Sequence, residues 1–268
     1  MTDKNTAGGL LSTRTCFKPF KYPWAYEAFM QSEQMHWLWT EVPMLEDVKD
    51  YGQKLTDSER DFLTKILRFF TQGDIDVSGA YVNHYLPRFG QPEVRMMLSS
   101  FAAREAVHIA AYSHLIETIG LPESIYNEFL QYEAMAAKHD FFNEVAEDSR
   151  DLAAQIAAFS AFTAWSIADE TLHTESMTKL FREYIVENPE LWNDSLKAKI
   201  YGIAETMVEL EDRFIDLAFG VSEMRRLTRE EVRSYIRYIA DRRLIGLGMK
   251  GIFGIKKNPL PWVDAMLG

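Results

Sequence analysis

The 268-residue sequence has little of several features that mark common protein classes. Its single cysteine, Cys16, excludes a disulfide scaffold and a cysteine-built metal site, and it fits a reducing cytoplasm. Lysine and arginine number 29 against 40 acidic residues, and the resulting charge of −11 disfavours binding to nucleic-acid phosphates. The longest uncharged run, Leu152 to Ala168, carries polar side chains and is shorter than a bilayer requires. We therefore expect a cytoplasmic protein that binds neither nucleic acid nor membrane.

Signals for β-structure and for chain reversal are also scarce. There are only 14 glycines and 9 prolines, and runs of alternating β-branched residues are absent. Hydrophobic residues make up 47% of the chain and recur with helical spacing, which predicts an all-α fold with a substantial core. The expected helices are Tyr22 to Trp37, Thr56 to Tyr85, Pro92 to Ile119, Pro122 to Phe142, Arg150 to Val186, Asp194 to Phe219 and Thr228 to Leu247.

The segments between these helices indicate one domain without repeats. We expect a flexible N-terminus over about residues 1–20, an irregular acidic link over 40–55 and an extended segment over about 256–268. Thr56 and Thr228 each precede a glutamate by three residues, which predicts a capping box at both helix starts. Gly120, followed by Pro122, is typical of a helix end.

Three of the six histidines follow a glutamate by three residues, so both side chains share one helix face. The pairs are Glu33 with His36, Glu105 with His108, and Glu170 with His173. The last two pairs lie in or beside long uncharged stretches, where a carboxylate needs a partner such as a metal ion. Two facing Glu-x-x-His helices with further carboxylates form the dimetal site of ferritin-like bundles. We interpret the first pair, whose neighbours are polar, as a surface pair.

Three further residues are candidates for the same site. Asp74 shares a helix face with Phe70, whereas Asp76 points elsewhere. Tyr112 follows His108 by four residues and lies on the metal-facing side, although a buried core tyrosine would fit the same pattern. Asp169 could accept the free N–H of a ligating histidine, or it could be an ordinary exposed charge.

The sequence resembles the small, radical-generating subunit of class I ribonucleotide reductase over most of its length. The motifs that carry the resemblance are His36-Trp37 followed by Glu41, Phe69-Phe70-x-x-x-Asp74, Glu105-x-x-His108-x-x-x-Tyr112, Asp169-Glu170-x-x-His173 and Asn258-Pro259-x-Pro261-Trp262.

The resemblance implies a ferritin-like helical bundle with additional helices, which forms a homodimer. It implies that two iron ions, or manganese or a mixed pair, bind to Asp74, Glu105, His108, Glu170 and His173. Reduced metal and O₂ would oxidise Tyr112 to a tyrosyl radical. Trp37 and Asp169 would then connect the metals with the large subunit, which holds the ribonucleotide and uses the radical to reduce it.

The sequence departs from the family pattern in three places. A sixth metal ligand, a glutamate on the helix before Asp169, has no counterpart, and about thirty residues of a helical hairpin are missing between Thr163 and Ala164. Glu144 or Glu147 could replace that ligand, although the surrounding residues have the composition of a loop. The family's docking tail has no counterpart before Gly268, and Ala168 stands where the family usually has arginine.

These departures keep two other functions open. One is a dimetal oxidase that acts alone on a small apolar ligand, which would need an open cavity beside Tyr112. The other is a helical remnant that binds one metal or none. The metal content per chain would distinguish the remnant from both enzymes.

Overall fold

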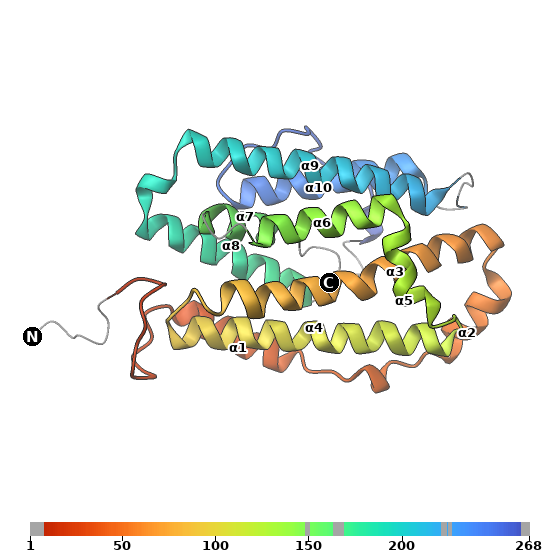
Figure 1. Ribbon diagram of the computed structural model, residues 1–268, viewed down its shortest axis with the longest axis horizontal. Helices are drawn as coiled ribbons and strands as arrows, with labels where there is room; N and C mark the ends of the chain where they lie inside the picture. The colour runs from red at the N-terminus through yellow and green to blue at the C-terminus, as the bar shows by residue number, and fades with distance from the viewer. Residues whose placement is uncertain (1–7, 148–150, 163–168, 221–223, 225–226, 264–268) are drawn as a thin grey trace, which may run out of the picture. The chain divides into compact units, whose positions relative to one another are not determined.

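The computed structural model describes residues 8–147, 151–162, 169–220, 224 and 227–263. Every regular element in these ranges is helical (Figure 1), which confirms the all-α prediction. The long helices are α1 (Pro23–Gln34), α3 (Asp57–Ala80), α4 (Pro92–Thr118), α6 (Glu133–Glu147), α7 (Leu152–Phe162), α8 (Asp169–Glu187), α9 (Asp194–Phe219) and α10 (Arg229–Gly246). No described helix has the length and apolar content of a membrane span.

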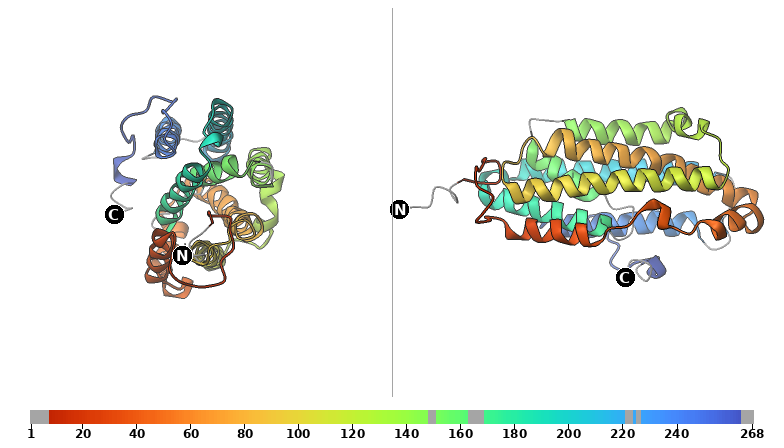
Figure 2. Two further views of the ribbon diagram at one scale, coloured as in Figure 1. Left: turned by 90° about the vertical axis from the view of Figure 1, so that its left-hand side faces the viewer. Right: turned by 90° about the horizontal axis from the view of Figure 1, so that it is seen from below.

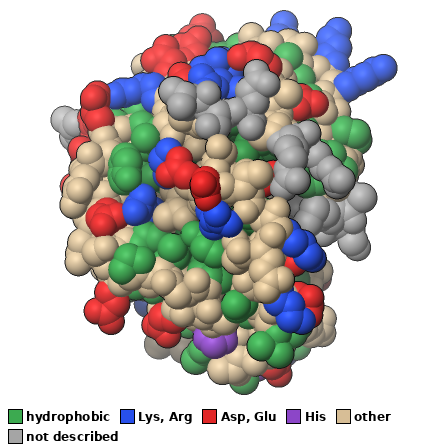
Figure 3. Space-filling view, turned by 90° about the vertical axis from the view of Figure 1, so that its right-hand side faces the viewer, with side chains coloured by type: hydrophobic (Ala, Val, Ile, Leu, Met, Phe, Trp, Pro, Cys, Tyr) green, Lys and Arg blue, Asp and Glu red, His purple; other side chains and the backbone are tan. Residues whose placement is uncertain are grey.

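The chain divides into two compact units whose segments alternate along the sequence. Unit 1 comprises Met1–His36, Val77–Ala106 and Val145–Ile200, and unit 2 comprises Trp37–Asp76, Val107–Glu144 and Tyr201–Gly268. In unit 1, α8 packs against both α7 and α1, and α1 can be followed beside α8 in Figure 2. In unit 2, residues of α9 and α10 form an apolar cluster with Phe62 of α3. Acidic and basic side chains alternate on the face in Figure 3, so the negative charge does not gather there.

The prediction of one continuous helix from Arg150 to Val186 is wrong. The structure has two helices in this stretch, α7 and α8, which pack against each other. Residues 152–160 of α7 are all buried, as expected for a helix without a polar face. Neither glycine nor proline occurs between the two helices, over residues 163–168, which lie outside the described part of the chain.

Other helix boundaries also differ from the predicted ones. The segment predicted as one helix from Pro122 to Phe142 is broken into α5 (Ser124–Glu128), a 3₁₀ turn (Phe129–Gln131) and α6, because Tyr132 is extended. The link over 40–55 contains a 3₁₀ turn (Trp39–Glu41), α2 (Leu45–Lys49) and a π-helical turn (Asp50–Lys54). A further π-helical turn (Tyr81–Tyr85) continues α3, and a 3₁₀ turn (Pro189–Leu191) precedes α9.

The predicted helix ends are confirmed at three positions. The Thr56 hydroxyl accepts the Glu59 N–H at 3.3 Å, and the Glu59 carboxylate accepts the Thr56 N–H at 2.8 Å. Thr228 and Glu231 form the same capping box at the start of α10. Gly120 adopts a φ of +80°, the left-handed conformation that ends α4.

Two acidic side chains anchor the N-terminal segment of unit 1. Glu93, which is fully buried, accepts the backbone N–H groups of Lys21 and Tyr22 and pairs with Arg14 at 2.7 Å. Glu187 accepts the Leu10 N–H at 2.7 Å and the Tyr22 hydroxyl. The segment before α1 is therefore attached to both α4 and α8 in this unit.

The Glu187 anchor should weaken as the pH falls. Burial alone would raise the pKa of Glu187, but hydrogen bonds from Tyr22, Leu10 and Lys21 hold that pKa below its usual range. A carboxyl group with a lowered folded-state pKa stabilises the fold above its unfolded pKa, and it loses this contribution as the pH falls through the folded value. Glu187→Gln should lower the free energy of unfolding by about 1 kcal/mol at pH 7, and this difference should shrink as the pH falls below the usual range of a glutamate pKa.

Denaturant titrations of both proteins between pH 7 and pH 3 measure this difference, with Glu190→Gln as an exposed control. A difference that stays constant over the range would contradict the assignment.

Unit 2 contains a buried ion pair between Lys138 of α6 and Glu211 of α9. The Lys138 ammonium lies 2.6 Å from the Glu211 carboxylate, and both side chains are 4% exposed. Burial lowers the pKa of Lys138 and raises that of Glu211, while each charge counteracts the shift of the other. The ammonium also lies over the rings of Phe69 and Phe214, at 3.9 and 4.7 Å from their centroids.

Removing one charge of this pair should destabilise the protein more than removing both. Glu211→Leu leaves the Lys138 charge buried and should cost about 3–5 kcal/mol in unfolding free energy. The double variant Lys138→Met, Glu211→Leu should recover most of that loss, because no uncompensated charge remains. Urea unfolding of the four proteins of this double-mutant cycle measures the coupling, and additive effects would contradict it.

Candidate metal centre

Helix α4 places the first Glu-x-x-His pair in the protein interior. Glu105 is fully buried and His108 is 5% exposed, and their spacing puts both on one face of this continuous helix. The apolar residues Phe101 and Ala102, one turn earlier, are also buried. A glutamate in such surroundings requires a cation or hydrogen-bond donors nearby.

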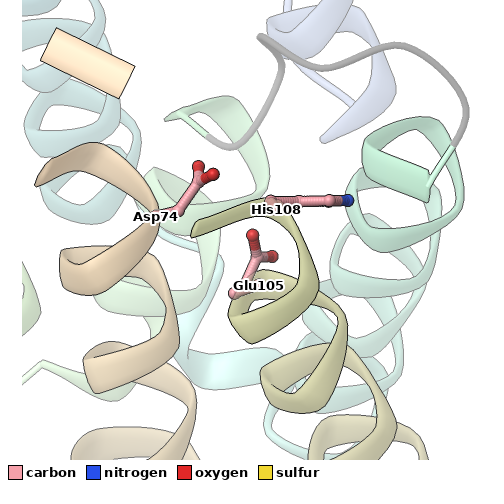
Figure 4. Close-up of side chains that lie close together, drawn as sticks. All are labelled: Asp74, Glu105 and His108. Atoms are coloured by element: carbon pink, nitrogen blue, oxygen red, sulfur yellow. The ribbon is translucent and has the colours of Figure 1, made fainter. Parts of the chain in front are cut away.

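Helix α3 contributes a second carboxylate to this location. Asp74, Glu105 and His108 each offer one ligand atom, and these atoms lie within 4.8 Å of one another. Figure 4 shows the Asp74 carboxylate, from α3, approaching the Glu105 carboxylate, with His108 on the next turn of α4. Asp74 is half-buried, so three donors of the predicted set meet away from bulk solvent.

The second Glu-x-x-His pair contributes His173, on α8. Its ring is fully buried, and Nδ1 lies 3.1 Å from Oε1 of Glu105. Adjacent ligands of one metal ion have a similar separation, about 3 Å for bonds near 2.1 Å at right angles. The ring also contacts Phe101 and Tyr81, with centroid separations of 4.1 and 6.0 Å. The sequence analysis missed both aromatics, although Phe101 precedes Glu105 by one helical turn.

Of the remaining predicted site residues, the structure places Trp37 and Tyr112 but not the side chains of Asp169 and Glu170. The side chains of Asp169 and Glu170 lie outside the described residues, so their predicted roles stay predictions. Trp37 stacks on His108 with a centroid separation of 6.0 Å and an interplanar angle of 23°. Tyr112 stacks on Phe70 at 5.5 Å and belongs to an apolar cluster of unit 2.

Other acids singled out in the sequence lie elsewhere. Glu33 is exposed and accepts the Ser100 hydroxyl at 2.7 Å, while His36 is also exposed, which confirms this pair as a surface pair. Glu144 and Glu147 are exposed on α6, so the loop expected around them is a helix. Asp76 points away from Asp74, as predicted, and pairs with the ring of His139 at 2.6 Å, a contact that the sequence did not indicate.

The described donors fit a cation with mixed oxygen and nitrogen ligands. Two carboxylates and two imidazoles belong to this set, and Glu105 links them because it lies close to the other three. Carboxylate and imidazole are ligands of iron and manganese, and the set contains no thiolate. The chemistry of the donors therefore agrees with the predicted metal site.

Comparisons with known proteins decide the family. The profile described as "Ribonucleotide reductase, small chain" matches residues 14–165 and 158–259. The chain is 44% identical over 305 residues to a probable ribonucleoside-diphosphate reductase small subunit of Invertebrate iridescent virus 3, covering 96% of this chain and 81% of the relative. The chain belongs to the ribonucleotide reductase small-chain family. A second relative, from Invertebrate iridescent virus 6, is 40% identical over 325 residues and is covered over 90% of its length.

Solved structures of this family share the fold. The R2 subunit of ribonucleotide reductase from Clostridium botulinum superposes with a TM-score of 0.88 at 20% identity, covering 96% of this chain and 93% of that structure. A dimanganese(II) NrdF from Streptococcus sanguinis gives a TM-score of 0.80 at 18% identity, with 96% and 100% covered. The ferritin-like helical bundle predicted from the motifs is therefore confirmed.

The comparisons also bear on the missing hairpin. The ribonucleotide reductase profile matches in two parts that meet at residues 158–165, which shows that the family pattern is interrupted there. The alignment with the iridescent virus 3 relative spans 305 positions, more than the 268 residues of the chain. The relative thus has segments without a counterpart here, and the deletion between Thr163 and Ala164 stays a prediction.

Proposed function

We propose that this chain generates and stores the radical that a class I ribonucleotide reductase uses to reduce ribonucleotides to deoxyribonucleotides, acting with a large subunit that binds the substrate. Family membership supports the reaction. The observation that carries the proposal is the buried position of Glu105, whose carboxylate lies close to Asp74, His108 and His173. Such a convergence of acids and imidazoles in a dry interior is typical of a dimetal carboxylate site.

In this proposal Asp74, Glu105, His108, Glu170 and His173 hold two metal ions. Iron is our first choice, and manganese or a mixed pair suits the same donors. When bound, the metal pair supplies the one-electron oxidising chemistry of the family. The chain provides carboxylate and imidazole ligands. It also provides the rings of Phe101 and Tyr81, which exclude water from His173.

Tyr112 would store the oxidising equivalent as a tyrosyl radical. Its ring stacks on Phe70 and packs among Leu67, Ile116 and neighbouring apolar side chains. Formation of the radical removes one electron and the phenolic proton from Tyr112. Apolar packing on the ring slows reaction of the radical with solvent reductants, which supports a storage role for this residue.

Trp37 and Asp169 would connect the metal site with the large subunit. The stacked contact of Trp37 with His108 supports this route, because it places an oxidisable ring against a proposed ligand. We further propose that the protein acts in the cytoplasm as a homodimer, as the resemblance implies. The sixth ligand has no assigned residue in this scheme.

A Trp37→Phe variant tests the proposal by separating radical formation from its use. After anaerobic loading with Fe(II) and exposure to air, the variant should give the wild-type tyrosyl signal by electron paramagnetic resonance. Its reduction of a ribonucleoside diphosphate with the large subunit should fall to the background of the large subunit alone. The exposed Trp39, two residues after Trp37, is the matched control when it is replaced by phenylalanine.

Wild-type turnover in Trp37→Phe would exclude the proposed route through this residue. Absence of both radical and turnover in the wild-type protein would instead favour the helical remnant.

A further inference from the structure

Arg104 of α4 is a buried cation that leaves part of its hydrogen-bonding capacity unused. The residue is 8% exposed and directly precedes Glu105 of the proposed metal site. Its Nη2 lies 3.5 Å from Nδ1 of His36, while its Nε and Nη1 have no hydrogen-bond partner among the described residues. Burial of a guanidinium with unbonded N–H groups costs free energy, so a contribution to stability does not explain this arginine.

Arg104 belongs to a row of contacts between α4 and the end of α1. Ser100, Arg104 and His108 follow one another at intervals of four residues, so they lie along one side of α4. The Ser100 hydroxyl donates to the Glu33 carboxylate at 2.7 Å, and one turn later Arg104 meets His36. The contacts therefore advance together along α4 and along the chain that leaves α1.

The last contact of this row is the stack of Trp37 on His108, with a centroid separation of 6.0 Å. Trp37 directly follows His36, and residues 36–38 have no regular secondary structure. The N–H of Met35 makes the last helical hydrogen bond of α1, so the position of the next residues depends on the contacts of their side chains. The contact of His36 is thus the nearest one that can orient the indole ring.

We propose that Arg104 is a positioning residue for Trp37 and that it acts through His36. The buried guanidinium holds the His36 imidazole beside α4, and the adjoining Trp37 then presents its ring to His108. This role rests on the proposed function, in which Trp37 connects the metal site with the large subunit. Because a displacement of about 1 Å can slow a reaction about a hundredfold, a residue that only orients Trp37 can control turnover.

Fluorine NMR of the metal-free full-length chain, labelled with 5-fluorotryptophan, tests this proposal without a measurement of activity. Replacing each of the six tryptophans in turn by phenylalanine assigns the resonances. His108→Ala gives the position of the Trp37 resonance without its stacking partner. In Arg104→Met, the Trp37 resonance should move towards that position. The Trp192 resonance should stay in place, because this ring contacts Phe181 elsewhere in unit 1.

Three further variants separate positioning from a general loss of stability. His36→Ala, at an exposed residue that should tolerate the change, should move the Trp37 resonance in the same direction as Arg104→Met. The double variant should move it no further than the larger single change, because both residues act through one contact. Arg242→Met, at an exposed arginine of α10, is the matched control and should leave this resonance unchanged.

The stability of Arg104→Met distinguishes a positioning role from a structural one. Methionine fills the space of the arginine side chain without its unbonded N–H groups, so the variant should unfold at the same urea concentration as the wild-type protein or at a higher one. Earlier unfolding, with every tryptophan resonance displaced, would show that Arg104 supports the whole fold and would overturn the positioning role. An unmoved Trp37 resonance or additive shifts in the double variant would also overturn it.

Arg104→Met should also separate radical formation from radical use. After loading with Fe(II) and air, the variant should give the wild-type tyrosyl signal by electron paramagnetic resonance. Its turnover with the large subunit should fall at least about tenfold. Turnover at the wild-type rate would overturn the positioning role. Absence of the radical in the wild-type protein would contradict the proposed function instead, and the NMR result does not depend on it.

Discussion

Replacing Tyr112 by phenylalanine should abolish the tyrosyl radical while leaving the metal content unchanged. The substitution removes only the phenolic hydroxyl, and phenylalanine can keep the stacked contact with Phe70. Phenylalanine cannot be oxidised at the potentials that oxidise tyrosine. Electron paramagnetic resonance after loading with Fe(II) and air should therefore show no tyrosyl signal. Turnover with the large subunit should fall to the background of that subunit alone.

The matched control for Tyr112 is Tyr126, which packs in the same apolar cluster and bonds Ser113 through its hydroxyl at 3.0 Å. Tyr126→Phe should retain the full radical signal, because this tyrosine has no proposed redox role. A persistent tyrosyl signal in Tyr112→Phe would assign the radical to another residue. Tyr81, which contacts His173, would then be the first one to replace.

Replacing Glu105 by glutamine should weaken metal binding by at least about a hundredfold. Glutamine has nearly the same shape, so the packing of α4 is preserved, but the negative charge beside Asp74, His108 and His173 is lost. Metal analysis after reconstitution and desalting should find fewer than two ions per chain. His173→Ala should have a similar effect through the loss of its imidazole.

Glu33→Gln is the matched control for Glu105→Gln, because Glu33 occupies the same Glu-x-x-His spacing on an exposed surface. It should leave the metal content at the wild-type value. An equal loss of metal in both variants would mean that removing any glutamate lowers the metal content, and Glu105 would then not be assigned as a ligand. Unchanged metal binding in Glu105→Gln would exclude this residue from the site.

Much of the fold could be predicted because the signals for it are local. Helical spacing and the capping residues Thr56 and Thr228 located helix starts correctly, and Asp194–Phe219 was predicted with its observed bounds. The break between α7 and α8 could not be predicted, because no turn residue marks it. The packing of α7 against α8, with residues 152–160 all buried, is a tertiary effect that local sequence does not encode.

In the candidate site, too, contacts within one helix were easier to predict than contacts between helices. The Glu105 and His108 pair was visible because both residues lie on one helix, where spacing determines direction. The approach of His173 to Glu105 joins residues 68 positions apart, and the repeated Glu-x-x-His motif predicted it together with the family resemblance. Asp76 with His139, and Lys138 with Glu211, join different helices and have no sequence signature.

The central claim is that Asp74, Glu105, His108 and His173 share bound metal. Anomalous diffraction at the iron or manganese absorption edge, from crystals of the reconstituted protein, tests it most directly. The account predicts two anomalous peaks, with the four side chains within bonding distance of at least one of them. Peaks elsewhere, or no peak at all in fully reconstituted protein, would contradict it.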